Sequence, residues 1–131
     1  MSAEEIIAAH YQAGAKGDFP GMIQDFSDNI SWTESAGGSL AGSFSGLNEV
    51  IAGVFEKIGS EWDGFGAVPE YLIADETSGR VAAVCNYVGT NKKTGKAQES
   101  VRVVHLWTVK DGKIVAFEQV CDTAQQAKFG S

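Results

Sequence analysis

The sequence has little of several residue types and patterns, and each shortage excludes a class of protein. Its apolar runs span only a few residues, far short of the roughly 20 that cross a bilayer, so we expect no membrane partner. Lys and Arg number 10 against 17 Asp and Glu, for a net charge of -7. We therefore expect no nucleic-acid partner, because phosphate binding needs a basic surface. The N-terminus lacks the basic region of a secretory signal, which favours a cytoplasmic protein.

Cysteine and histidine are equally scarce, with two of each in 131 residues. Cys85 and Cys121 lie far apart in apolar runs, without a CxxC pair or an adjacent histidine. We therefore expect two buried free thiols and no metal or redox site. The length is that of a single domain, residues 1–131.

Helical patterns occupy the first half of the chain. Ser2 followed by Glu5 forms a capping box, which predicts a helix ending near Lys16. Asp18 predicts the start of a short second helix, and the apolar spacing over residues 47–58 predicts a third that stops at Gly59. Between the last two, Ile30, Trp32 and Glu34 alternate with polar residues and predict a short strand. The Gly- and Ser-rich residues 35–46 that follow predict a loop.

The second half of the chain is typical of a β-meander. Four long strands are predicted, over residues 65–75, 80–90, 97–110 and 113–121. Asp122 then begins a short terminal helix. Helices first and strands afterwards indicate an α+β domain, in which three N-terminal helices pack on one face of a curved antiparallel sheet.

The strand over residues 97–110 carries the most informative polar residue. Its more apolar face, which we expect to point inward, contains Val103, His105 and Trp107. A two-residue turn at Asp111-Gly112 would place His105 opposite Glu118 on the next strand. A bulge at Gly112 would instead shift the register by one residue and place Gln119 there.

Four polar residues are candidates for acid–base chemistry: His105, Glu118, Glu34 and Asp122. A carboxyl group beside an imidazole in apolar surroundings can titrate near neutrality, where general catalysis is effective. Each residue also has a purely structural interpretation. His105 and Glu118 could simply satisfy one another, Glu34 could be a solvated strand end, and Asp122 could only cap the last helix. We expect Trp32, Val103, Trp107 and Trp62 to contact a substrate or cover its pocket, and His10 to be a packed or surface residue.

The opposite face of the predicted sheet is unusually apolar for a surface in contact with water. It carries Arg102, Val104 and Leu106, with Val115 and Phe117 expected across the hairpin. We therefore expect a homodimer through this outer face.

Five segments, in this order, resemble the nuclear transport factor 2-like superfamily and, within it, the SnoaL-like and ketosteroid-isomerase-like branch. They are residues 17–19, 28–32, 40–47, 105–114 and 122–124. The resemblance spans nearly the whole chain and implies a cone-shaped fold, a bent sheet wrapped around the helices with a deep apolar pocket between them. It also implies a homodimer.

The resemblance implies two site arrangements. Glu34 lies near the position of the carboxylate that moves a proton in the isomerases. The isomerase residues that stabilise the enolate have no secure match in this sequence, and this difference argues against steroid isomerisation. His105 with Glu118 or Asp122 resembles the histidine and acid of SnoaL-like cyclases. We expect a cofactor-free enzyme that binds a small hydrophobic carbonyl compound, without metal, or a non-catalytic ligand-binding domain of the same fold.

Overall fold

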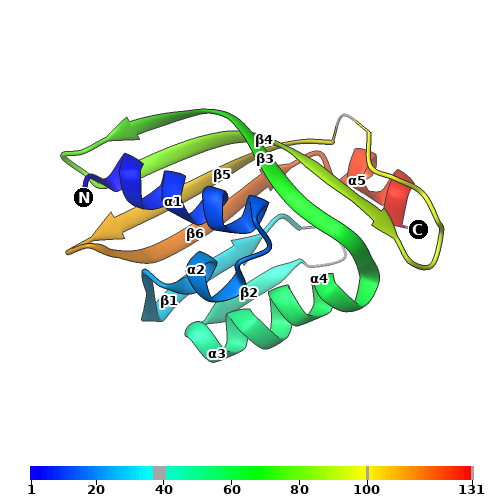
Figure 1. Ribbon diagram of the computed structural model, residues 1–131, viewed down its shortest axis with the longest axis horizontal. Helices are drawn as coiled ribbons and strands as arrows, with labels where there is room; N and C mark the ends of the chain where they lie inside the picture. The colour runs from blue at the N-terminus through cyan, green and yellow to red at the C-terminus, as the bar shows by residue number, and fades with distance from the viewer. Residues whose placement is uncertain (37–40, 100, 131) are drawn as a thin grey trace.

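The computed structural model describes residues 1–36, 41–99 and 101–130 (Figure 1). The helices cover one face of a curved six-stranded sheet, which remains open rather than closing into a barrel. The elements are α1 (Ala3–Ala15), α2 (Phe19–Ile23), β1 (Phe26–Glu34), β2 (Gly42–Ser45), α3 (Leu47–Val50), η1 (Ile51–Phe55), α4 (Glu56–Glu61), β3 (Trp62–Asp75), β4 (Arg80–Asn91), β5 (Val101–Lys110), β6 (Lys113–Cys121) and α5 (Thr123–Gly130).

The α+β class and the bent sheet agree with the sequence prediction, but the sheet is mixed. Its strand order is β2-β1-β6-β5-β4-β3. β3 to β6 form an antiparallel meander, whereas β1 pairs with β6 in the parallel direction and with β2 in the antiparallel direction. β1 therefore lies beside the last strand of the meander and runs in the same direction.

Helix α1 lies across the inner face of the sheet (Figure 1). The predicted capping box is present: Ser2 Oγ accepts from Glu5 N, and Glu5 Oε1 accepts from Ser2 N. The helix buries Ile6, Ile7, His10 and Tyr11 against the core. It thereby brings a histidine and a tyrosine from the N-terminus over the middle of the meander.

The stretch predicted as a loop contains a strand. β2 pairs with β1, with Phe44 opposite Trp32. A Cβ on Gly53 would overlap the Phe44 ring, so this glycine leaves the space in which the ring packs against the helix. Packing of Phe44 against the core favours a strand here although the sequence has low β propensity. Residues 37–40 of the predicted loop lie outside the described residues. They include Leu40, the first residue of the segment 40–47 on which the family resemblance partly rests.

Other boundaries differ from the prediction by a few residues. β1 begins at Phe26 rather than at Ile30. The third helix passes through Gly59 and runs as α3, η1 and α4 to Glu61, with a π-helical turn at Ile51–Phe55. β5 begins at Val101 rather than Ala97, which forms only an isolated bridge to Thr90. Ser100 lies outside the described residues.

The β5–β6 hairpin contains a bulge that sets which side chains enter the core. Lys110 pairs with Lys113 across Asp111 and Gly112, as predicted, and both turn residues have positive φ. Ile114 then pairs with Val109 but Ala116 with Thr108, so Val115 is an extra residue on β6. Because successive side chains in a strand point to opposite faces, this insertion exchanges the faces of every later residue of β6.

The bulge makes the predicted pairing of His105 with Glu118 wrong. Gln119 lies opposite His105, and Glu118 lies opposite Leu106 on the exposed outer face. The predicted outer-face position of Phe117 is also wrong, because Phe117 pairs with Trp107 and is buried. The alternative register with Gln119 is the observed one, although the extra residue is Val115 rather than Gly112.

A continuous apolar core lies between the inner face of the sheet and the helices. In the described parts of the chain, every helix is too short or too polar to cross a membrane.

Candidate functional site

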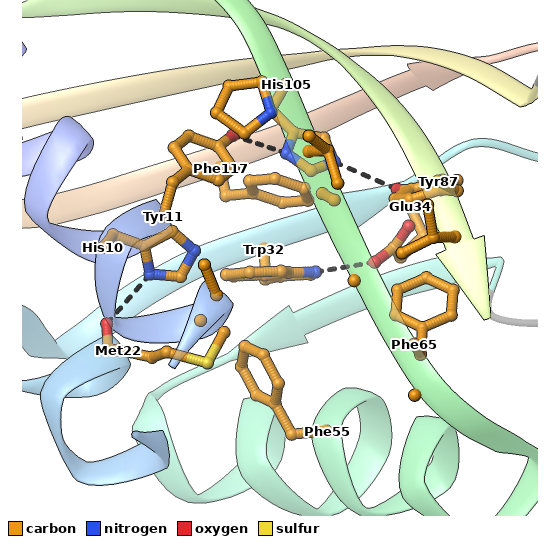
Figure 2. A pocket seen from close by; sticks show the side chains of 18 residues that line it. His10, Tyr11, Met22, Trp32, Glu34, Phe55, Phe65, Tyr87, His105 and Phe117 are labelled. Atoms are coloured by element: carbon orange, nitrogen blue, oxygen red, sulfur yellow. Dashed lines mark hydrogen bonds between the residues drawn. The ribbon is translucent and has the colours of Figure 1, made fainter. Parts of the chain in front are cut away.

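A cavity of about 390 Å³ lies between α1, the π-helical turn and the inner face of the sheet (Figure 2). Its wall is mainly aromatic and apolar, and Glu34 is the only carboxylic acid among the described residues that line it. The side chains with polar or aromatic groups are His10, Tyr11, Trp32, Glu34, Phe55, Phe65, Tyr87, His105 and Phe117. This combination of apolar wall and few polar groups is typical of small-molecule sites.

Glu34 reaches the cavity from the end of β1. Alternation along the strand places Ile30, Trp32 and Glu34 on one face, as the sequence predicts, and the structure shows that this face is buried. The Glu34 side chain is 6% exposed. Trp32 donates its indole N–H to Glu34 Oε1 at 2.9 Å, and the other oxygen, Oε2, is buried without a partner among the described residues (Figure 2).

The surroundings of Glu34 favour its protonated form. Burial raises the pKa of this carboxyl from 4.5 to about 7, while the hydrogen bond from Trp32 acts in the opposite direction. A carboxyl group with such a pKa exchanges protons readily near neutral pH. Its unpartnered oxygen is the position where a proton or a ligand group would bind.

His105 is held between two tyrosines. Its Nδ1 lies 2.7 Å from the Tyr11 hydroxyl oxygen on α1, and its Nε2 lies 3.0 Å from the Tyr87 hydroxyl oxygen on β4. Trp107 donates its indole N–H to Tyr11 at 2.9 Å. Burial, and secondarily the nearby His10, lower the pKa of His105 to about 3. The ring is therefore neutral at physiological pH and both of its nitrogens are occupied.

Gln119 completes this network from β6. Its amide Nε2 donates to the Tyr87 hydroxyl at 2.6 Å. Its Oε1 accepts from the backbone N–H of Ser35 at 3.1 Å, and its backbone carbonyl accepts from Ser35 Oγ at 2.8 Å. A backbone N–H can only donate, so these contacts fix which end of the amide faces Tyr87.

Aromatic packing holds these polar groups in place. Trp32 stacks on Phe117 with ring centroids 3.7 Å apart, and Phe55 contacts Trp32 edge-on at 5.5 Å. His10 donates from Nδ1 to the carbonyl oxygen of Met22 at 2.9 Å, and burial lowers its pKa. Its ring packs against Trp107 at 4.8 Å. Rigid packing of this kind limits the positions that a ligand can take.

The structure brings three of the sequence-predicted residues into one cavity: Trp32, Glu34 and His105. Val103 and Trp107 point inward but lie behind the wall, in the core, where Val103 pairs with Cys85 and Cys121. Trp62 is also buried, but it is not among the described residues that line the cavity. It packs edge-on against Phe65, which does line the cavity.

Two of the predicted acids lie elsewhere. The bulge at Val115 turns Glu118 to the outer face of the sheet, where it is exposed. Asp122 is exposed and accepts from the backbone N–H of Gln125 at 3.1 Å, as a cap of α5. Neither carboxyl can therefore serve as the partner of His105.

The site also contains residues to which the sequence prediction gave no role in the site. Tyr11 shares a helical stripe with Ile7, and Tyr87 follows Val81, Ala83 and Cys85 on the buried side of β4. Both periodicities are visible in the sequence and indicate that the tyrosines point inward. Their contact with His105 is not visible there, because it joins residues 94 and 18 positions apart.

Residues 7–117 match the SnoaL-like domain family. The chain belongs to the SnoaL-like family. Small-molecule binding and catalysis without a cofactor both occur in this family. No curated protein matches this SnoaL-like chain.

Solved structures show the same architecture. A nuclear transport factor 2-like protein from Burkholderia thailandensis is 37% identical to this SnoaL-like chain, with a TM-score of 0.91 over 100% of this chain and 98% of the other. TerC, co-crystallised with polyporic acid, is 22% identical, with a TM-score of 0.84 over 97% and 96% of the two chains. A Catenulispora acidiphila protein with a ketosteroid isomerase-like fold, in complex with trimethylamine, is 13% identical, with a TM-score of 0.79 over 96% and 92%.

Proposed function

We propose that this SnoaL-like domain is a cofactor-free enzyme that transfers a proton within a small hydrophobic carbonyl compound, with Glu34 as the proton carrier. The observation that supports it best is the unpartnered Oε2 of Glu34, buried in an apolar cavity on a carboxyl whose pKa is about 7. A buried acceptor without a donor costs free energy in the empty protein. A bound substrate with an acidic hydrogen would remove that cost.

The reaction needs only protein groups and the substrate. The Glu34 carboxylate takes a proton from the carbon next to a carbonyl, and the electrons of the C–H bond form a C=C bond while the carbonyl oxygen becomes an enolate. The protonated Glu34 then returns the proton to another atom of the same molecule, which regenerates the carboxylate. The product is an isomer of the substrate. Where the enolate carbon attacks a second carbonyl of the same molecule, the isomer formed contains a new ring.

The wall of the cavity favours this chemistry. Trp32, Phe55 and Phe117 give the cavity an apolar wall. Such a wall disfavours water, which would otherwise solvate the carboxylate and weaken it as a base. A volume of about 390 Å³ falls in the range of small-molecule pockets. TerC, with the same fold, was co-crystallised with polyporic acid, which is consistent with an organic ligand in such a cavity.

In this proposal His105 orients other groups and transfers no proton to or from the substrate. A histidine with a pKa of about 3 holds a proton too weakly to act as a general acid at neutral pH. Both ring nitrogens also lie within hydrogen-bonding distance of tyrosine hydroxyls, so neither is free to reach a substrate.

The test uses 5-nitrobenzisoxazole, an aromatic probe that opens to a coloured product after losing one proton from carbon. We expect turnover that rises with pH through an apparent pKa near 7 and falls at least tenfold in Glu34→Gln. Glu118→Gln is the matched control, since Glu118 lies on the same sheet but faces outward. Equal turnover in wild type and Glu34→Gln would contradict the proposal.

A non-catalytic binding domain is the second candidate, and the same cavity gives a specific reason for it. A carboxylate among aromatic faces also suits an organic cation, through charge and cation–π contacts. The Catenulispora acidiphila protein of this fold holds trimethylamine. Calorimetric binding of trimethylammonium that is lost in Glu34→Gln, with no turnover of the probe by wild type, would favour this alternative.

We also propose a homodimer through the outer face of the sheet. Tyr71, Ile73, Leu106 and Val120 are exposed on this face, at 39% to 63%. Large apolar side chains gathered on one sheet face favour association. A second copy of the chain offers a surface of matching character, as a two-fold interface requires.

A further inference from the structure

The buried hydrogen bonds around His105 have a direction. We infer that they run from Trp107 through Tyr11 and His105 to Tyr87, and that the Tyr87 hydroxyl therefore donates its own proton into the cavity, to an oxygen atom of the ligand. Figure 2 shows Tyr11, His105 and Tyr87 in line above the cavity, with Glu34 below Tyr87 in this view.

The direction is set at the first member. The indole N–H of Trp107 can only donate, so the Tyr11 oxygen is the acceptor in their 2.9 Å contact. The Tyr11 proton is then available to another acceptor. His105 Nδ1, at 2.7 Å, is the best placed one.

The lengths of the two contacts of His105 agree with this direction. Hydrogen bonds that a hydroxyl group donates to oxygen are most often about 2.7–2.8 Å long, and those that an N–H group donates to oxygen about 2.9–3.0 Å. The contact with Tyr11 is 2.7 Å and the contact with Tyr87 is 3.0 Å. With the Tyr11 oxygen already accepting from Trp107, Tyr11 donates to Nδ1, and the neutral ring carries its proton on Nε2 and donates it to Tyr87.

The reverse arrangement is poorer. With the proton on Nδ1, the Tyr11 oxygen would accept twice and its own proton would be directed to the sulfur of Cys85, which lies within hydrogen-bonding reach of Tyr11. Sulfur is a weak acceptor. The Nε2–H arrangement directs that proton to an imidazole nitrogen instead.

Tyr87 thus accepts two hydrogen bonds, one from His105 Nε2 and one from Gln119 Nε2. Both lone pairs of its oxygen are used, and its proton remains for a partner in the cavity that it lines. Two accepted hydrogen bonds also polarise the O–H group and strengthen it as a donor. On the same cavity, Glu34 Oε2 is an acceptor without a donor.

A ligand that satisfies both groups has an oxygen acceptor for Tyr87 and an acidic hydrogen within reach of Glu34. Carbonyl compounds with an acidic C–H, enols and phenols have both features, whereas an amine satisfies only Glu34 and a hydrocarbon neither. The choice of a carbonyl compound rests on the proposed function. The direction of the hydrogen bonds does not, and it is tested without substrate.

The first test is the tautomer of each histidine, read from ¹⁵N chemical shifts of ring-labelled protein. His10 is an internal reference, because its Nδ1 must donate to the Met22 carbonyl and so carries the proton. We expect the opposite tautomer at His105, with Nδ1 unprotonated and Nε2 protonated. Two histidines of the Nδ1–H form would overturn the inference, whatever the activity of the protein.

The second test is binding of 4-nitrophenolate in the Glu34→Gln background, at a pH where the free phenol is ionised. This background removes the proposed proton carrier and leaves the Tyr87 donor. Adding Tyr87→Phe should weaken binding roughly tenfold or more, as expected for loss of a hydrogen bond to a charged oxygen. Tyr71→Phe, at an exposed tyrosine on the outer face, is the matched control and should leave binding unchanged.

Equal affinity in the Tyr87→Phe protein and its parent, or no binding to either, would overturn the inference. The proposed function is judged separately, by the dependence of probe turnover on Glu34 in the otherwise unchanged chain. Tyr87 could therefore fail as an oxygen donor while Glu34 still transfers a proton, and the converse result is equally distinguishable.

Discussion

Trp32 and Glu34 lie two residues apart on β1 and are joined by a hydrogen bond. Within the described part of the chain, it is the only hydrogen bond of the Glu34 carboxyl group. The indole N–H donates to Oε1 at 2.9 Å and leaves Oε2 open to the cavity. Because both side chains lie on the buried side of one strand, the contact is set by strand geometry. It both positions the carboxyl and restrains the rise in its pKa.

Removal of the indole N–H should raise the pKa of Glu34. Trp32→Phe keeps a ring against Phe117 but removes the donor that favours the ionised carboxylate. We expect the pH profile of 5-nitrobenzisoxazole turnover to move to higher pH. Trp62→Phe, at a buried tryptophan outside the described lining, is the control and should leave the profile in place. A profile that moves to lower pH in Trp32→Phe would contradict the assignment.

Burial of Glu34 should make stability depend on pH in an unusual direction. The pKa of Glu34 is 4.5 in the unfolded chain and about 7 in the folded protein. Between these two pH values the folded state therefore holds a proton that the unfolded state has lost. This stabilisation is complete below pH 4.5 and is lost as pH rises through about 7. At 1.36 kcal/mol per pKa unit, the loss is roughly 3 kcal/mol.

Urea unfolding at several pH values measures this effect. We compare the free energy of unfolding of wild type with that of Glu34→Gln. The difference, wild type minus variant, should decrease as the pH rises from 4.5 to about 7. Glu118→Gln should retain the wild-type dependence, because that carboxyl is exposed on the outer face. A constant difference between wild type and Glu34→Gln would show that the folded-state pKa is not raised.

His105 should remain neutral across the physiological range. Its pKa is lowered from 6.5 to about 3, so its ring resonances should not titrate between pH 5 and 8 in NMR spectra. The sign of its effect on stability is opposite to that of Glu34. The unfolded state takes up the proton first, so this contribution is present above pH 6.5 and is lost as pH falls toward about 3. A titration midpoint near 6.5 in the folded protein would contradict the buried environment.

A charge on the outer face should disrupt the proposed dimer without unfolding the chain. Leu106 lies opposite Glu118, so Leu106→Lys places an opposite charge beside that carboxyl within the monomer. Light scattering should give twice the 13.9 kDa chain mass for wild type and a single chain for the variant. Gln12→Lys, at an exposed position of α1, should stay dimeric. A monomeric wild type at micromolar concentration would contradict the proposal.

Local patterns in the sequence were sufficient for much of the fold, because each rests on contacts between near neighbours. The capping box at Ser2 begins α1, the Asp111-Gly112 turn joins β5 and β6, and Asp122 caps α5. Alternation along β1 placed Glu34 on the same face as Trp32. The inward position of His105 followed in the same way from alternation along β5.

Only the tertiary structure decided how these elements meet, because the deciding contacts join distant parts of the chain. One extra residue, Val115, determines that Gln119 rather than Glu118 faces His105, and a single-residue shift has no signal in an apolar strand sequence. Packing of Phe44 beside Gly53 forms β2 in a stretch of low β propensity. Tyr11 reaches His105 across 94 positions because the apolar face of α1 must be buried on the sheet. The sequence by itself determined which side chains are inside, since burial follows local periodicity, and the tertiary packing decided which of them hydrogen-bond to one another.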